Sequence, residues 1–180
     1  QSMQMEAELI AEEECVVAGL SILPHCFPKV IIIQSFIMDG DIGKPNEVLA
    51  RIRGSARTIL NRERVVLNLL QRLCGIATKT RQYVECTQNY NFKVLDTRKM
   101  TPGLRMFEKF AVAVGGGYNH RLDLSTAVLI KDNHIISAGG LEPAVKNIQD
   151  SNPGIPIELE VDTLKQLKQG LNMNVDGFLL

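Results

Sequence analysis

The sequence predicts an α/β protein in which a small α+β domain is followed by strands and helices in regular alternation. Three observations indicate this fold class: a mixed pattern over residues 1–60, a long amphipathic stretch over residues 61–90, and alternating strand and helix signals over residues 91–180. Such alternation is typical of a parallel sheet or a β/α barrel. With 180 residues, 45% of them hydrophobic, the chain can form a sizeable core.

The first sixty residues combine one helical pattern with short apolar runs. Residues 5–19 are expected to form a helix, and residues 30–33 and 48–52 to form strands. Turn residues at 39–41 and 44–46 separate these elements. The segment MDGDIGKPNEVLARIRGSA is similar to the strand pairs of biotinyl and lipoyl carriers, but it lacks their Met-Lys-Met attachment site, which argues against a carrier role.

A long amphipathic helix is expected over residues 61–88, with Asn61 as its N-cap and apolar residues at helical spacing. After it, strands are expected at 92–95, 127–130, 157–160 and 178–180, and helices at 102–114, 141–149 and 163–169. Thr101 and Pro102 supply the N-cap and first turn of the helix at 102–114, and Gly115 ends it.

The charge balance favours a small ligand over nucleic acid or an anionic membrane. Twenty basic and twenty acidic residues cancel, so any anion site must be local. Since no apolar run approaches the roughly 20 residues that a membrane span needs, and no signal peptide is recognisable, we expect a cytoplasmic location. The chain opens without Met and stops in an apolar run, which suggests a fragment truncated at both ends.

The four cysteines favour neither a zinc site nor a disulfide framework. They show no C-x-x-C spacing and no paired histidine, and we interpret them as reduced structural thiols: Cys15, Cys26, Cys74 and Cys86.

Cationic side chains follow the predicted strands, at the edge that forms the catalytic face of a β/α barrel. Arg98 and Lys99 come after the first strand and before a helix N-terminus, which favours an anion site, although a solvated basic turn is the simpler interpretation of this pair alone. Lys131 ends the second strand, and an ammonium group there requires either Glu160 or an anion as its partner.

The loop after the helix at 102–114 carries a triple glycine followed by His120 and Arg121. Glycines allow close backbone approach to a ligand, and an arginine fork matches a carboxylate, but a flexible turn with a structural histidine fits the pattern equally well. The residues at 132–134 are candidate ligands, although Asx residues after a strand more often build turns. Glu160 either balances Lys131 or contacts Mg²⁺, which one or two carboxylates can hold. A small, multiply anionic ligand suits this set.

The blocks LDTRKMTPGLRMFEKFAVAVGGGYNHRLDLSTAVLIKDNHI, RERVVLNLLQRLCGIAT and ELEVD resemble the quinolinate phosphoribosyltransferase family over nearly the whole chain. The resemblance implies an N-terminal α/β sandwich and an incomplete parallel β/α barrel. It also implies a glycosyltransferase, the carboxylating nicotinate-nucleotide diphosphorylase of NAD biosynthesis. Such an enzyme transfers phosphoribose from phosphoribosyl pyrophosphate to quinolinate, giving nicotinate mononucleotide, pyrophosphate and carbon dioxide.

The same resemblance implies a role for each site residue. It gives Arg98, His120, Arg121 and Lys131 to the carboxylates of quinolinate, Lys99 to the anionic groups, and Glu160 to Mg²⁺ and the ribose. Lys99, Lys131 and Glu160 are the expected catalytic residues. It also gives Arg64 to the neighbouring site of a homodimer, so that Arg64 acts in trans. Met100 stands where relatives often carry Thr.

Two other functions remain possible on the same scaffold. One is the phosphoribosyltransferase relative found in molybdate-transport operons, whose pattern lacks the Lys-Asp-Asn-His run at 131–134. The other is a non-catalytic anion-binding barrel protein, since a fold does not fix a function.

Overall fold

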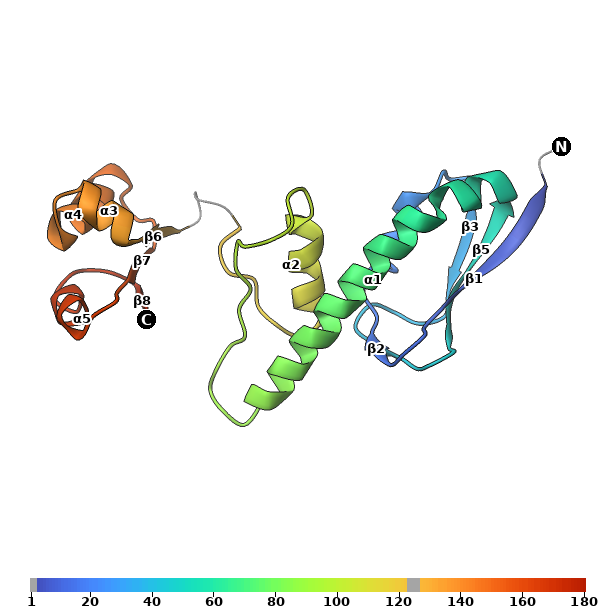
Figure 1. Ribbon diagram of the computed structural model, residues 1–180, viewed down its shortest axis with the longest axis horizontal. Helices are drawn as coiled ribbons and strands as arrows, with labels where there is room; N and C mark the ends of the chain where they lie inside the picture. The colour runs from blue at the N-terminus through green and yellow to red at the C-terminus, as the bar shows by residue number, and fades with distance from the viewer. Residues whose placement is uncertain (1–2, 123–126) are drawn as a thin grey trace. The chain divides into compact units, whose positions relative to one another are not determined.

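The structure is a computed structural model that describes residues 3–122 and 127–180 (Figure 1). The chain divides into two compact units, Gln1–His120 and Arg121–Leu180, and each unit is described here by itself. Residues 123–126, which belong to the long motif that carries the family resemblance, lie outside the described residues.

The N-terminal unit contains two small antiparallel sheets. The three-stranded sheet has the order β1-β5-β3, formed by β1 (Gln4–Ile10), β5 (Val48–Ser55) and β3 (Ile32–Ser35). The second sheet pairs β2 (Cys15–Val16) with β4 (Ile42–Gly43), and a short 3-10 helix, η1 (Leu23–Cys26), follows β2. The strands predicted at 30–33 and 48–52 are therefore present, with β3 beginning two positions later than expected.

The helix predicted over residues 5–19 is wrong, because most of this segment forms β1 and β2. Its Met, Glu, Ala and Leu residues favour helices, but tertiary pairing overrides this weak preference. Half-buried and exposed side chains alternate along β1, as in a strand with one covered face. Glu6 lies opposite Arg53 and Glu8 opposite Arg51, and both pairs form salt bridges. These charge pairs across the strands are invisible to a local sequence pattern.

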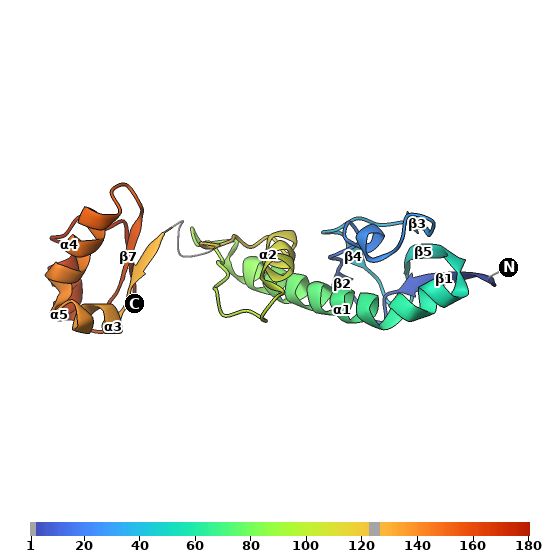
Figure 2. The ribbon, with the colours of Figure 1, turned by 90° about the horizontal axis from the view of Figure 1, so that it is seen from above.

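The helix α1 (Ala56–Thr87) joins the parts of the N-terminal unit. It begins at Ala56 with Ser55 as N-cap, so the N-cap predicted at Asn61 is wrong. Figure 2 shows the strands beside its first half and α2 (Arg105–Val114) beside its second half. One face is buried throughout and consists of Ile59, Val66, Leu70, Leu73, Ala77 and Thr80. Its first members share a core with β5 and η1, whereas Leu73 and Ala77 pack with Val16 and Ala111.

The start of α2 differs from the prediction and its end agrees with it. Thr101 is not the N-cap, because the helix begins at Arg105 after a turn; Gly115 is the C-cap, as expected. The predicted strand at 92–95 is reduced to one parallel bridge between Leu95 and Tyr118.

The C-terminal unit is a three-stranded parallel sheet with connecting helices, as the alternating pattern predicts. Its strands β6 (Val128–Ile130), β7 (Ile157–Glu160) and β8 (Gly177–Leu179) are ordered β6-β7-β8. The helices are α3 (Asp132–Ser137), α4 (Leu141–Ser151) and α5 (Leu164–Gly170), of which α3 was not expected. Strand and helix side chains share one core that includes Ile130, Val145 and Leu159. This unit confirms the predicted βα architecture.

Across the part of the chain that the structure describes, no helix is both long and apolar enough to cross a membrane.

Candidate active site

A buried ion pair lies beneath the segment that carries Arg98 and Lys99. Lys109 Nζ of α2 donates to Asp96 Oδ1 at 2.6 Å, and the two side chains are 4% and 2% exposed. Asp96 directly follows the bridge at Leu95 and starts the D-T-R-K motif. A charge pair this deeply buried must be well hydrogen-bonded to be tolerated, which directs attention to its other partners.

The other partners of this pair belong to the loop that contains His120. The backbone N–H of His120 donates to Asp96 Oδ1 at 2.8 Å, and Lys109 Nζ donates to the backbone oxygen of His120 at 3.1 Å. With its amide turned to satisfy both of its polar atoms, Asn119 donates to Asp96 Oδ2 at 2.7 Å and to Lys109 O at 2.9 Å. The pair therefore holds the predicted substrate-binding residue His120 by its backbone.

The triple glycine brings its loop close to α1. A Cβ at Gly115 would lie 2.5 Å from Ala77 O and 2.7 Å from Thr80 Cβ. One at Gly117 would lie 2.8 Å from Thr80 Cγ2, and Gly116 has a φ of +91° that side chains rarely adopt. Arg81 Nε of α1 donates to Gly115 O at 3.0 Å. In the N-terminal unit, the close approach that these glycines permit is thus to helix α1.

The structure places the remaining predicted residues of the N-terminal unit near its surface. Arg98 is half-buried, and Lys99 is exposed, with its N–H bonded to Thr97 Oγ1. Since α2 begins only at Arg105, neither residue lies in the first turn of a helix, and the expected contribution of a helix N-terminus is wrong. Arg64 is exposed on α1.

In the C-terminal unit, Lys131 and Glu160 lie together. Ile130 and Leu159 are partners in the parallel β6–β7 register, so the residues after them are neighbours at the carboxyl edge of the sheet. Lys131 Nζ is 3.2 Å from Glu160 Oε2, and the side chains are 45% and 32% exposed. Of the two partners that the sequence left open for Lys131, the structure shows Glu160.

Arg121 opens the C-terminal unit and is half-buried. Its Nη1 donates to Ala127 O at 2.8 Å, just before β6. Arg121 and His120 are sequence neighbours at the boundary between the two units, and the structure describes the environment of each within its own unit. That all five cationic residues line one pocket stays a prediction.

The residues at 132–134 form the first turn of α3. Lys131 N donates to His134 Nδ1 at 3.0 Å, and Asn133 N donates to Asp132 Oδ1 at 2.7 Å. His134 therefore satisfies an N-terminal backbone donor of α3, and its ring acts as an acceptor through Nδ1. These contacts support the local structural interpretation of this run over the ligand interpretation.

Glu160 also has a carboxylate oxygen that a bound cation could contact. Its Oε2 is inaccessible to solvent and accepts no hydrogen bond of acceptable geometry from the described residues, although Lys131 Nζ is near. A buried, unsatisfied carboxylate oxygen fits the hard oxygen ligand that Mg²⁺ prefers. Among the residues that the structure describes, no group of three or more His, Cys, Asp or Glu could enclose a metal, so the fit rests on this one carboxylate.

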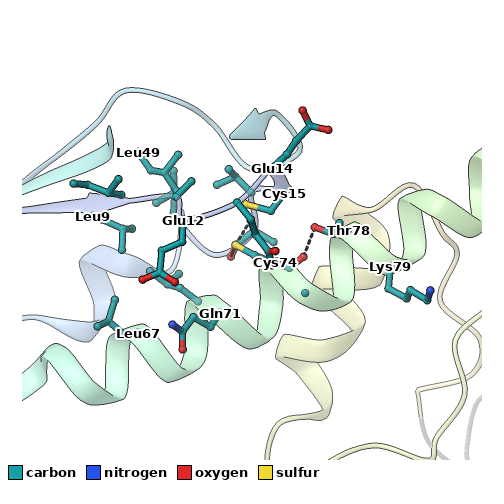
Figure 3. Close-up of a pocket in the computed structure, with 18 of the residues that line it drawn as sticks. Leu9, Glu12, Glu14, Cys15, Leu49, Leu67, Gln71, Cys74, Thr78 and Lys79 are labelled. Carbon is teal, nitrogen blue, oxygen red and sulfur yellow. Dashed lines mark hydrogen bonds between the residues drawn. The ribbon is translucent and has the colours of Figure 1, made fainter. Parts of the chain in front are cut away.

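The N-terminal unit contains a pocket of about 890 Å³, and none of the predicted site residues of this unit lines it (Figure 3). It lies between the N-terminal strands and α1, and it is lined by Cys15 and by Cys74, whose Sγ donates to Ala18 O at 3.5 Å. Burial raises the pKa of the Cys74 thiol to about 11 and also raises the pKa of Cys15. Neither thiol is a ready nucleophile near neutral pH.

Sequence reasoning missed two buried charges on α2, Glu108 and Lys109. Both Arg72 Nε and Nη2 of α1 contact Glu108 Oε1, at 2.7 and 2.6 Å, and Thr101 N donates to Glu108 Oε2 at 3.2 Å. Burial opposes ionisation of Glu108, but the hydrogen bonds from Thr101 and Arg72 prevail and hold its pKa below the ordinary 4.5. The available signal was the run FEKFAVAV, in which two charges interrupt an otherwise apolar helix.

The comparisons with known proteins identify the family. The model of the quinolinate phosphoribosyl transferase N-terminal domain matches residues 1–74, and that of the C-terminal domain matches residues 76–180. The chain belongs to the quinolinate phosphoribosyl transferase family. The resemblance stated from the sequence motifs is thereby confirmed, and so is the fold class.

Individual relatives agree with the family models. A probable carboxylating nicotinate-nucleotide pyrophosphorylase of Bacillus subtilis is 45% identical over 95% of this chain and 61% of its own length. One from Synechocystis is 38% identical over 97% of this chain and 61% of its own length. The chain thus spans about three fifths of the length of these relatives.

Solved structures of family members also match. NadC from Streptococcus pyogenes has a TM-score of 0.90 at 40% identity, covering 97% of this chain and 64% of that one. The nicotinate-nucleotide pyrophosphorylase of Ehrlichia chaffeensis has a TM-score of 0.94 at 36% identity, covering 100% and 67%.

Proposed function

We propose that the protein transfers phosphoribose from phosphoribosyl pyrophosphate to quinolinate with decarboxylation. The products are nicotinate mononucleotide, pyrophosphate and carbon dioxide, a step of NAD biosynthesis. The observation that carries the proposal is the 45% identity to a relative named as a carboxylating nicotinate-nucleotide pyrophosphorylase. The chain contains each site motif of the resemblance: D-T-R-K, G-G-G-x-N-H-R and K-D-N-H.

The cationic side chains would bind the two carboxylates of quinolinate. Arg98 and Arg121 present planar forks that match a carboxylate with two parallel hydrogen bonds, which a lysine cannot do. His120 and Lys131 complete the set, and Lys99 serves the phosphate groups. Two carboxylates held at several points fix the ring nitrogen toward the sugar, so the main contribution of these residues is orientation.

The steps of the proposed reaction are explained by stabilisation of the charges that develop on the leaving group and on the pyridine ring. Departure of pyrophosphate leaves an oxocarbenium-like sugar carbon, and Lys99 and Lys131 stabilise the negative charge that develops on the leaving group. The pyridine nitrogen attacks this carbon and becomes quaternary. The adjacent carboxylate then leaves as carbon dioxide, because the ring cation stabilises the electron pair left on the ring carbon. That carbon takes up a proton from solvent, which gives nicotinate mononucleotide.

We further propose that Glu160 contributes to a Mg²⁺ site. Its solvent-inaccessible and unsatisfied Oε2 supports this role. When bound, Mg²⁺ would neutralise charge on the pyrophosphate and polarise its bond to the sugar. Lys131 near the same oxygen would orient the carboxylate in the absence of the ion.

A homodimer in which Arg64 acts on the neighbouring site is part of the same proposal. Arg64 is exposed on α1, so it is available to a partner subunit. Mixing full-length Arg64→Ala and Arg121→Ala subunits, each inactive alone, should restore some activity, since one site of each mixed dimer has both residues intact. If subunits exchange and activity does not return, Arg64 acts in its own subunit.

We also propose a cytoplasmic location for the protein.

The function is tested by incubating the full-length protein with quinolinate, phosphoribosyl pyrophosphate and Mg²⁺. Nicotinate mononucleotide and carbon dioxide should appear in equal amounts, as measured by chromatography and release of labelled carbon dioxide. Turnover of nicotinate without turnover of quinolinate would contradict the proposal.

A further inference from the structure

We propose that the buried Asp96–Lys109 pair is a positioning pair that sets the backbone of the His120 loop against the Arg98 segment. This inference rests on the function proposed above, and it adds two residues that touch no substrate. Asp96, Lys109 and His120 all belong to the N-terminal unit, so the contacts between them lie within one compact unit.

Both polar backbone atoms of His120 hydrogen-bond to this pair. Its N–H donates to Asp96 Oδ1 at 2.8 Å, and its carbonyl oxygen accepts from Lys109 Nζ at 3.1 Å. Asp96 in turn is fixed through its own backbone, since Asp96 N donates to Tyr118 O at 3.1 Å. Two chain segments far apart in sequence are thereby locked in one register, and Arg98 lies two residues beyond Asp96.

Stability of the fold alone is a poor reason for this arrangement. Burying two charges costs desolvation that their attraction seldom exceeds by much, and apolar replacements of similar volume often fold as well. What an apolar pair cannot supply is an acceptor for the backbone N–H and a donor for the backbone carbonyl of one residue, His120. Because a small displacement of binding groups costs substantial catalysis, the hydrogen bonds to His120 are the property that the pair provides.

The decisive variant removes both charges and keeps the packing. Lys109→Met alone leaves the buried Asp96 carboxyl without its ion-pair partner, and should lower Tm strongly. Adding Asp96→Asn removes the unpaired charge, so the double variant should regain most of the lost Tm while His120 O still lacks its donor. In full-length protein the double variant should raise the KM for quinolinate by about tenfold or more. The KM for phosphoribosyl pyrophosphate should stay within about twofold of wild type.

A matched control is available on the same helix. Arg72→Met with Glu108→Gln removes the neighbouring ion pair of α2, whose bonds go to α1 and Thr101 and not to His120. This control should lower Tm, with a quinolinate KM within about twofold of wild type. A purely structural role for Asp96 and Lys109 would give both double variants the same kinetic behaviour.

A second measurement does not depend on catalysis. Amide hydrogen exchange at His120 should be about tenfold faster in the Asp96→Asn, Lys109→Met protein than in the control double variant. If the wild type makes no nicotinate mononucleotide, the proposed function fails, and the exchange rate alone decides the role of the pair. Unchanged exchange at His120, or restored Tm with an unchanged quinolinate KM, would overturn the proposal. Should the double variant not fold, the quinolinate KM and the hydrogen exchange at His120 are both measured on Asp96→Asn alone. Its KM for quinolinate should rise by at least about threefold.

Discussion

Lys131 Nζ lies 3.2 Å from Glu160 Oε2, which joins the residue that follows β6 to the residue that ends β7. Both side chains are partly exposed, so water screens the pair and its contribution to folding stability is small. The proposed chemistry at this edge of the sheet explains the arrangement better. Lys131 would contact the anionic substrates there, and Glu160 would contact Mg²⁺. In the proposed site, Glu160 would contact Lys131 when Mg²⁺ is absent and the ion when it is bound.

Glu160→Gln is expected to raise the Mg²⁺ concentration for half-maximal activity by at least about tenfold, because an amide oxygen carries no charge to hold the ion. The measurement is initial rate against free Mg²⁺ in full-length protein. Asp162→Asn, two residues beyond on an exposed position, is the matched control and should leave the Mg²⁺ dependence unchanged. Equal Mg²⁺ dependence in all three proteins would remove Glu160 from the metal site.

Arg121→Ala is expected to weaken quinolinate binding by roughly 2 to 5 kcal/mol, since its loss leaves a buried carboxylate without its partner. Binding of phosphoribosyl pyrophosphate should be nearly intact, and calorimetric titration of each ligand checks both values. The bond from Arg121 Nη1 to Ala127 O offers a rival, structural role. In that case the two ligands should lose affinity equally.

Local signals predicted the elements whose stability is mainly local or whose apolar run is unambiguous. The strand β7 lies where the sequence placed it, α1 was recognised from its apolar face, and α5 from the alternation of strand and helix signals. Residues 5–19 failed because their strand state depends on Arg51 and Arg53, which lie far along the chain. The helix α3 was hidden because Asp132 and Asn133 favour turns as readily as a first helical turn.

The motifs of the candidate site could be predicted from the sequence, but the buried residues that hold these motifs in place could not. Lys131 and Glu160 follow from strand ends in a parallel sheet, so their meeting could be anticipated. Lys109 could not, because a lysine on a helix is ordinarily solvated and its partner Asp96 lies in an irregular segment. The pairing of a buried lysine with the backbone of His120 is a tertiary fact without a periodic signal.

The Glu108 carboxyl should make folding stability depend on pH in the acid range. Its pKa is below the ordinary 4.5 in the folded chain, so the unfolded chain binds the proton more tightly. The stabilisation is therefore complete above about pH 4.5 and is lost as pH falls through the lower, folded pKa. Glu108→Gln should cost roughly 1 to 2 kcal/mol at neutral pH, toward the low end because Arg72 is screened by water, and little in acid.

Urea unfolding of both proteins from neutral pH to about pH 3 measures this effect. The difference between wild type and Glu108→Gln should shrink steadily below about pH 4.5. Glu85→Gln, an exposed change on α1, is the control and should give a small difference at every pH. Parallel stability curves for wild type and Glu108→Gln would show that the pKa of Glu108 does not differ between the folded and the unfolded chain.

Gly115→Ala and Gly75→Ala should change stability in opposite directions. At Gly115 the φ of −68° suits alanine, but the new methyl group would lie 2.5 Å from Ala77 O, so α1 and the loop must separate. We expect a loss of roughly 1 to 3 kcal/mol and a weakened affinity for quinolinate, because the loop leads directly to His120. Gly75 lies within α1 with nothing within 4 Å of an added Cβ, so alanine there should gain up to about 1 kcal/mol through helix propensity. Chemical unfolding and quinolinate titration of the two variants check both effects. A Gly115→Ala protein as stable as wild type would mean that the close contact between α1 and the glycine loop does not constrain this part of the fold.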